Sequence, residues 1–116
     1  MGSKFYIIVR TQFIGKHLWK DAPLEVDFLK LIHRHVFHIE AKIPVSHDNR
    51  QLEFFTVQKF LNETITKMYP DGIMKGTSCE MLAEKLVTAI STAYGVKRDV
   101  SVSVFEDNEN GGVCEI

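Results

Sequence analysis

Three histidines in the first third of the chain could bind one metal ion together. His33 and His35 are two residues apart, and on a β-strand such side chains project from the same face. Their ring nitrogens could then meet at one ion at about 2 Å, the usual zinc–nitrogen distance. His17, from an upstream loop, would complete a three-histidine set with an open fourth position, which a catalytic zinc requires. The alternative for His33 and His35 is a pair of half-buried or solvated side chains that share no ion.

The composition of the chain limits the kinds of protein it can be. Its 116 residues are enough for one domain with a single core, and 45% apolar and 25% charged residues are typical of globular proteins. A formal net charge of -1 gives no electrostatic reason to bind nucleic acid or an acidic membrane, and no apolar run approaches a membrane span. Two cysteines are too few for a disulfide framework, and the N-terminus lacks the pattern of a signal peptide. We therefore expect a cytoplasmic protein without nucleic-acid or membrane partners.

Several segments have the side-chain pattern of β-strands. Residues 4–13 are rich in β-branched and aromatic side chains, and residues 33–46 continue from the His-X-His pair as a long strand. Residues 24–32 fit either a strand or one or two helical turns. Shorter strands are predicted at 51–54, after a polar turn at 47–50, at 99–107, and at 113–116, after a turn at 108–112.

Two helices are predicted between these strands. Within residues 53–69, one face carries Phe54, Val57, Leu61, Ile65 and Met68. Residues 76–95 form the second helix, with Thr77 and Glu80 as a capping box and Gly95 as a left-handed terminator. Its predicted buried stripe consists of Met81, Leu82, Leu86, Ala89, Ile90 and Ala93. The pattern indicates one α+β domain over residues 1–116, with both helices packed on one face of an antiparallel sheet.

The order of short motifs along the chain resembles that of one enzyme family. A Phe-X-X-X-His at 13–17 is followed by a His-X-His at 33–35, an acid-Phe pair at 53–54, a Thr-Ser-X-Glu at 77–80 and a strand that ends in an acid at 104–107. This order is similar to that of 6-pyruvoyltetrahydropterin synthase and 6-carboxytetrahydropterin synthase, members of the T-fold (tunnelling fold) superfamily. The likeness covers nearly the whole chain.

The resemblance implies a zinc site beside a pocket for a pterin- or purine-like small molecule. The three histidines would bind Zn²⁺, and the carboxylate of Glu106 would accept two N–H bonds from the edge of the heterocycle. Thr77, Ser78 and Glu80, at a helix N-terminus, would contact the same ring. The resemblance further implies a four-stranded antiparallel sheet and a homo-oligomer, a trimer or a hexamer, with its pockets between subunits.

Two catalytic features of that family have no clear counterpart in this chain. The enzymes carry a cysteine shortly before the His-X-His, whose thiolate removes a proton, but the only potential base here is Asp27. They also carry an Asp-His pair after the first helix, where this chain has Asp71 followed by Gly72. Cys79 is a third candidate, because a helix N-terminus stabilises a thiolate. Alternatively, Cys79 is only a small side chain buried in the core, with no role in catalysis.

The sequence therefore leaves two functions open. One is a zinc-dependent pterin synthase or lyase that acts on a dihydropterin triphosphate-like substrate. The other is a non-catalytic T-fold module that binds a purine- or pterin-like molecule or nucleotide. The missing bases favour the binding module, whereas the three histidines favour the enzyme, since a protein that only binds has less need of zinc.

Overall fold

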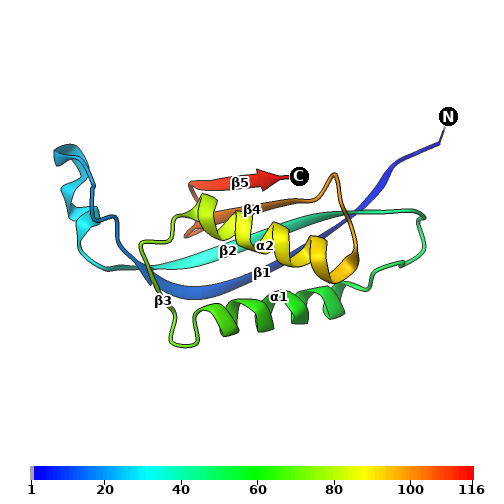
Figure 1. Cartoon of the computed structure of the whole chain (residues 1–116), viewed down its shortest axis with the longest axis horizontal. Helices are drawn as coiled ribbons and strands as arrows, with labels where there is room; N and C mark the ends of the chain where they lie inside the picture. The colour runs from blue at the N-terminus through cyan, green and yellow to red at the C-terminus, as the bar shows by residue number, and fades with distance from the viewer. Residues whose placement is uncertain (1) are drawn as a thin grey trace.

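A five-stranded sheet forms the centre of the fold in residues 2–116, which the computed structural model describes. Across the sheet the strands lie in the order β3-β1-β2-β4-β5 (Figure 1). In chain order the elements are β1 (Phe5–His17), the 3-10 helix η1 (Leu24–Lys30), β2 (His33–Val45), α1 (Phe54–Met68), β3 (Ile73–Lys75), α2 (Cys79–Tyr94), β4 (Ser101–Glu106) and β5 (Gly111–Glu115).

The predicted α+β fold is confirmed, but the sheet is not the four-stranded antiparallel sheet that was expected. The pairs β1-β2, β2-β4 and β4-β5 are antiparallel, whereas β3 pairs in parallel with the end of β1. The sheet is therefore mixed. β3 was not predicted, because a strand of three residues is too short to show the period-two alternation.

The first strand is longer than predicted and includes part of the expected loop. β1 continues to His17, and Gly15 lies within the strand opposite His35. A Cβ atom at Gly15 would lie 2.6 Å from the sulfur of Met74 and 3.0 Å from the ring of Phe37. Gly15 therefore allows close packing in the strand, a use of glycine that sequence alone does not distinguish from a turn.

The short strand predicted at residues 51–54 is wrong. α1 already begins at Phe54, and Glu53 is its N-cap. The Glu53 carboxylate accepts the N–H groups of Phe55 at 2.7 Å and Thr56 at 3.0 Å. These bonds, that of Phe55 above all, hold the pKa of Glu53 below its usual value, so the cap is anionic at neutral pH.

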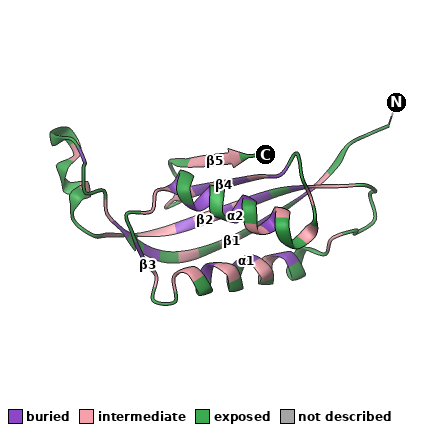
Figure 2. Ribbon diagram, in the orientation of Figure 1, coloured by how far each residue is buried: buried purple, intermediate pink, exposed green. Residues whose placement is uncertain are grey.

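Both helices pack on the same face of the sheet and enclose the core (Figures 1 and 2). α1 lies against β1, and α2 lies against β4 and β5. On the covered face of β2, alternate side chains are completely buried, as the period of a strand requires. These buried residues of β2 are Phe37, Ile39, Ala41 and Ile43, and they face the buried residues Val57, Leu61 and Ile65 of α1 and a corresponding stripe on α2.

The stripe that α2 buries differs in part from the predicted one. Met81 and Ala93 are exposed, because α2 packs against β4 and β5 with a different face. The buried residues of that face recur at intervals of three and four positions. The predicted capping box is also wrong, since the N-cap is Ser78, whose hydroxyl accepts the Met81 N–H at 3.1 Å. Gly95 ends the helix in the left-handed conformation, as predicted. The buried residues of α2 are Cys79, Leu82, Ala83, Leu86, Val87 and Ile90.

The segment between β1 and β2 projects from the body of the molecule (Figure 1). Of the two conformations that residues 24–32 allowed, the structure has a helical one, η1. Leu24, Phe28 and Leu31 are 85%, 65% and 72% exposed, so this segment presents apolar side chains to its surroundings. Such a group of exposed apolar side chains is typical of a contact surface.

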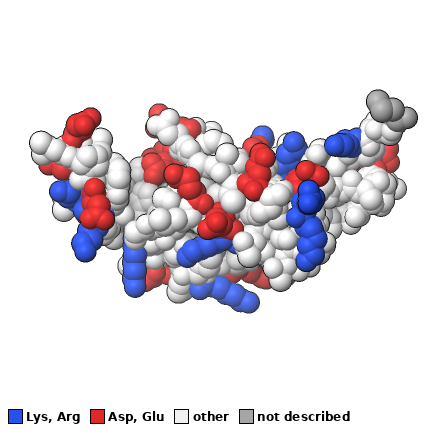
Figure 3. All heavy atoms as spheres, turned by 45° about the horizontal axis from the view of Figure 1, so that its top comes forward, with Lys and Arg blue, Asp and Glu red and all other residues white. Residues whose placement is uncertain are grey.

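The surface charges are mixed. On the face that Figure 3 displays, Lys and Arg side chains are interspersed with Asp and Glu, in keeping with a net charge of -1. Within residues 2–116, none of the helices has the length and apolarity needed to cross a lipid bilayer.

Candidate metal centre and its cavity

Strand pairing brings the three predicted histidines together. His17 and His33 lie directly opposite each other where β1 and β2 pair, and His35 follows two residues later on the same face. One ring nitrogen from each histidine lies within 4.8 Å of those of the other two. His17 is buried, with 8% of its surface exposed, and the other two are half-buried. The predicted cluster is thus present and could hold a metal ion.

Backbone carbonyls orient two of the three imidazoles. His17 Nδ1 lies 2.9 Å from the carbonyl oxygen of Thr77, and His33 Nδ1 lies 2.9 Å from that of Leu31. A carbonyl oxygen only accepts hydrogen bonds, so Nδ1 must carry the proton in both rings. In a neutral imidazole with its proton on Nδ1, the lone pair of Nε2 is free to bind a metal.

A carboxylate orients the third imidazole. His35 Nδ1 donates to Asp107 Oδ2 at 2.7 Å, and Asp107 Oδ1 accepts the Val36 N–H at 2.9 Å. These two hydrogen bonds lower the pKa of Asp107, and the bond from His35 has the larger effect. Asp107 is therefore anionic at neutral pH and holds His35 in the same tautomer as the other two histidines. Carboxylate–histidine–metal arrangements of this kind are common in zinc sites.

One buried ring nitrogen of the cluster has no hydrogen-bond partner within residues 2–116. His35 Nε2 is buried and makes no hydrogen bond. An unpaired buried polar group costs about 1–3 kcal/mol, which a metal ion at this position would offset. Two ligands of a tetrahedral zinc lie about 3.3 Å apart, so the rings need to approach by no more than about 1.5 Å. The residues could therefore hold a metal ion of this size.

Glu106 faces the same cluster from the neighbouring strand. It is the last residue of β4 and lies opposite Phe37, two residues along β2 from His35. Its Oε2 atom is 3.1 Å from His17 Nε2, and its Oε1 atom is 3.7 Å from His35 Nε2. Both carboxylate oxygens thus lie near Nε2 atoms of the cluster.

A cavity of about 440 Å³ opens beside the histidines. Its apolar wall includes Trp19 and Met81, and its polar wall includes Asn110 of the β4–β5 turn. The residues with a predicted role in ligand binding all line this cavity, whereas none of the described lining residues is Lys or Arg. Those predicted residues are Thr77, Ser78, Glu80 and Glu106.

The three candidate bases lie in different surroundings. Asp27 is exposed on η1, and Asp71 accepts the Ile73 N–H at 3.0 Å in the turn before β3. Neither is among the described residues that line the cavity. Cys79 does line it, but burial, followed by the charges of Glu106 and Glu80, raises the pKa of its thiol to about 12. The thiol therefore keeps its proton at neutral pH, which argues against Cys79 as a base.

Asp107 was not among the predicted site residues. The one available signal was its position directly after Glu106, at the end of a strand. Asp107 and Asn108 both have positive φ, at 52° and 59°, as consecutive residues do in tight hairpin turns. This turn directs the Asp107 carboxylate back toward β2, a direction that only the folded hairpin specifies.

No protein-family model matches this chain, and no curated protein matches its sequence. The likeness to the T-fold enzymes therefore rests on the order and spacing of the motifs quoted above, and membership of that superfamily stays a prediction.

Proposed function

We propose that the protein binds one zinc ion through His17, His33 and His35 and captures a pterin- or purine-like small molecule in the adjoining cavity. The observation that carries this proposal is the buried Nε2 atom of His35, which makes no hydrogen bond and lies among three imidazoles whose Nδ1 atoms are all hydrogen-bonded. Histidines that merely pack in a core are usually satisfied by hydrogen bonds, so an unpaired nitrogen in such a cluster favours a missing ion.

The cavity supports a flat, nitrogen-rich ligand. Its volume lies within the range of about 300–1,000 Å³ that is usual for small-molecule sites. Trp19 offers an apolar face for stacking, and the carboxylates of Glu80 and Glu106 accept paired N–H groups such as those on the edge of a pterin or guanine ring. Zinc, when bound, would polarise an oxygen atom of that ligand.

Turnover of a dihydropterin triphosphate-like substrate is the second candidate. The three histidines favour it, because they leave room for a catalytic ion. A triphosphate needs cationic partners, however, and no Lys or Arg is found among the described residues that line the cavity. In a homo-oligomeric T-fold ring a neighbouring subunit would have to supply these cations, and the exposed apolar side chains of Leu24, Phe28 and Leu31 suit such a contact.

The metal site is tested by zinc content in purified protein. We expect about one zinc per chain in the wild type and a loss of zinc in His33→Ala. The matched control is His38→Ala, because His38 lies on the same strand but projects from the opposite face. His33→Ala protein with full zinc occupancy would disprove the metal assignment.

Incubation with 7,8-dihydroneopterin triphosphate separates the binding module from the enzyme. The binding module is expected to retain the compound unchanged, as measured by mass spectrometry after equilibrium dialysis. Release of inorganic triphosphate by wild-type protein, but not by His33→Ala protein, would instead establish lyase chemistry.

A further inference from the structure

We infer that Glu106 is a fourth ligand to the metal when the cavity holds no small molecule. This inference rests on the proposed metal site and extends it, since the three-histidine set leaves one position open. The open position would be closed by the carboxylate of Glu106 and would become available only when Glu106 turns away.

The distances around Glu106 are those between ligands of one ion. Its oxygens lie 3.1 Å from His17 Nε2 and 3.7 Å from His35 Nε2. Two atoms bound tetrahedrally to zinc at about 2.0–2.2 Å lie about 3.3–3.5 Å apart, which falls between the two observed values. A simple ion pair between Glu106 and these imidazoles is the alternative, and metal binding by Glu106 variants distinguishes the two.

The backbone holds Glu106 in position for this role. Its N–H donates to the carbonyl oxygen of Asn110 at 2.8 Å, and its own carbonyl accepts the Glu109 N–H at 2.9 Å. β4 continues along the covered face from Val104 to Glu106, so the side chain projects toward the histidines. About one third of the Glu106 side chain remains exposed.

The same carboxylate also lines the cavity. Glu106 cannot direct the same oxygen lone pairs at a metal and at two N–H groups of a heterocycle. A ligand that offers paired N–H donors would therefore compete with the metal for Glu106 and would open the fourth position. Ligands without such donors would leave Glu106 in the fourth position of the metal, and the site would discriminate against them.

Cobalt substitution tests the inference, because the visible absorption of Co²⁺ depends on its ligands. Thiocyanate serves as the probe, since it binds the ion only where a position is open. We expect the Co²⁺ spectrum of the wild type to stay unchanged with thiocyanate, and that of Glu106→Ala to shift. We also expect Glu106→Ala to bind Co²⁺ at least about tenfold more weakly than the wild type.

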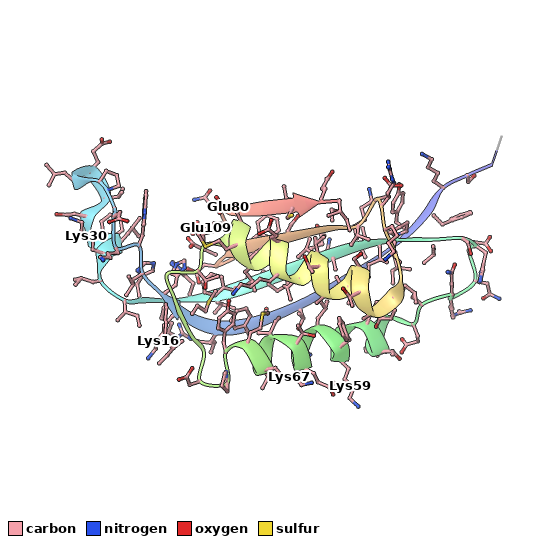
Figure 4. All side chains as sticks on the ribbon, in the orientation of Figure 1. Lys16, Lys30, Lys59, Lys67, Glu80 and Glu109 are labelled. Carbon is pink, nitrogen blue, oxygen red and sulfur yellow. The ribbon has the colours of Figure 1, made fainter. Side chains whose placement is uncertain are left out.

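Two further variants keep the test specific. Glu106→Gln retains the size of the side chain but not its charge, and we expect it to behave like Glu106→Ala. Glu109→Ala removes a carboxylate from the adjacent turn, where the residue is exposed (Figure 4), and we expect it to behave like the wild type. Equal Co²⁺ affinity in wild type and both Glu106 variants, with thiocyanate shifting all three spectra alike, would overturn the inference. Failure of the wild type to bind Co²⁺ would instead disprove the metal site itself.

Discussion

The covered face of the sheet has two halves that share the same strands and differ in chemistry. In one half, Ile39 and Ile43 of β2 and Val104 of β4 are completely buried under the helices. In the other half, the same alternation continues into polar residues, His35 on β2 and Glu106 on β4. The first half packs against the helices as part of the core, whereas in the second half the nitrogen atoms of histidine face the carboxylate oxygens of Glu106.

Phe37 is the boundary between these halves. It is completely buried, and its ring centroid lies 5.2 Å from that of His17 and 5.7 Å from that of His35. Beyond this ring Ser78, the N-cap of α2, and Cys79, its first residue, line an open cavity in place of a packed core. The difference shows that one strand pattern supports both a core and a site, with a packed core where the helices cover the sheet and a cavity where α2 begins.

Replacement of the boundary residue should give the largest effect. Phe37→Ala is expected to lower the free energy of unfolding by about 3–5 kcal/mol, because it empties a buried site beside Phe13 and the histidines. Urea denaturation measures the loss. Phe28→Ala, at a 65% exposed position on η1, is the control and should change stability by no more than about 0.5 kcal/mol. Equal stabilities for the two variants would show that the boundary is not part of the core.

Changes at the polar half should alter metal binding more than stability. Asp107→Asn keeps an oxygen that accepts from His35 but removes the negative charge, so zinc affinity should fall about 10–100-fold. Competition with a zinc chelator measures the change. The matched control is Asp99→Asn, another acidic residue with positive φ, which lies outside the cavity and should leave zinc affinity unaltered. A fall in zinc affinity of similar size in both variants would show that Asp107 has no specific role at the metal centre.

The smallest expected effect comes from Ser78, the N-cap of α2, which lies where the two halves meet. Ser78→Ala removes the hydroxyl that accepts the Met81 N–H and should lower stability by about 1 kcal/mol. Ser91→Ala, inside the same helix, should not lower stability, since alanine is the better helix former. Thermal unfolding of both variants compares the two positions. Greater destabilisation by Ser91→Ala would contradict Ser78 as the cap.

Local patterns in the sequence were sufficient for the long elements and for part of the site. The alternation from His33 to Ile39 predicted correctly that these side chains share one face. The i, i+3, i+4 spacing located α1 and α2, and Gly95 marked the end of α2. The same reasoning failed for short or ambiguous features, such as β3 and Gly15, where too few residues carry a period.

The sequence by itself determined which residues could bind a metal, because residue type and strand period are local properties. Only the tertiary structure decided how these residues meet. The bond between His17 and Thr77 joins residues 60 positions apart, and that between His35 and Asp107 joins residues 72 positions apart. The tautomers, the unpaired nitrogen and the direction of the Glu106 carboxylate depend on these distant pairings, which no local pattern of side chains encodes.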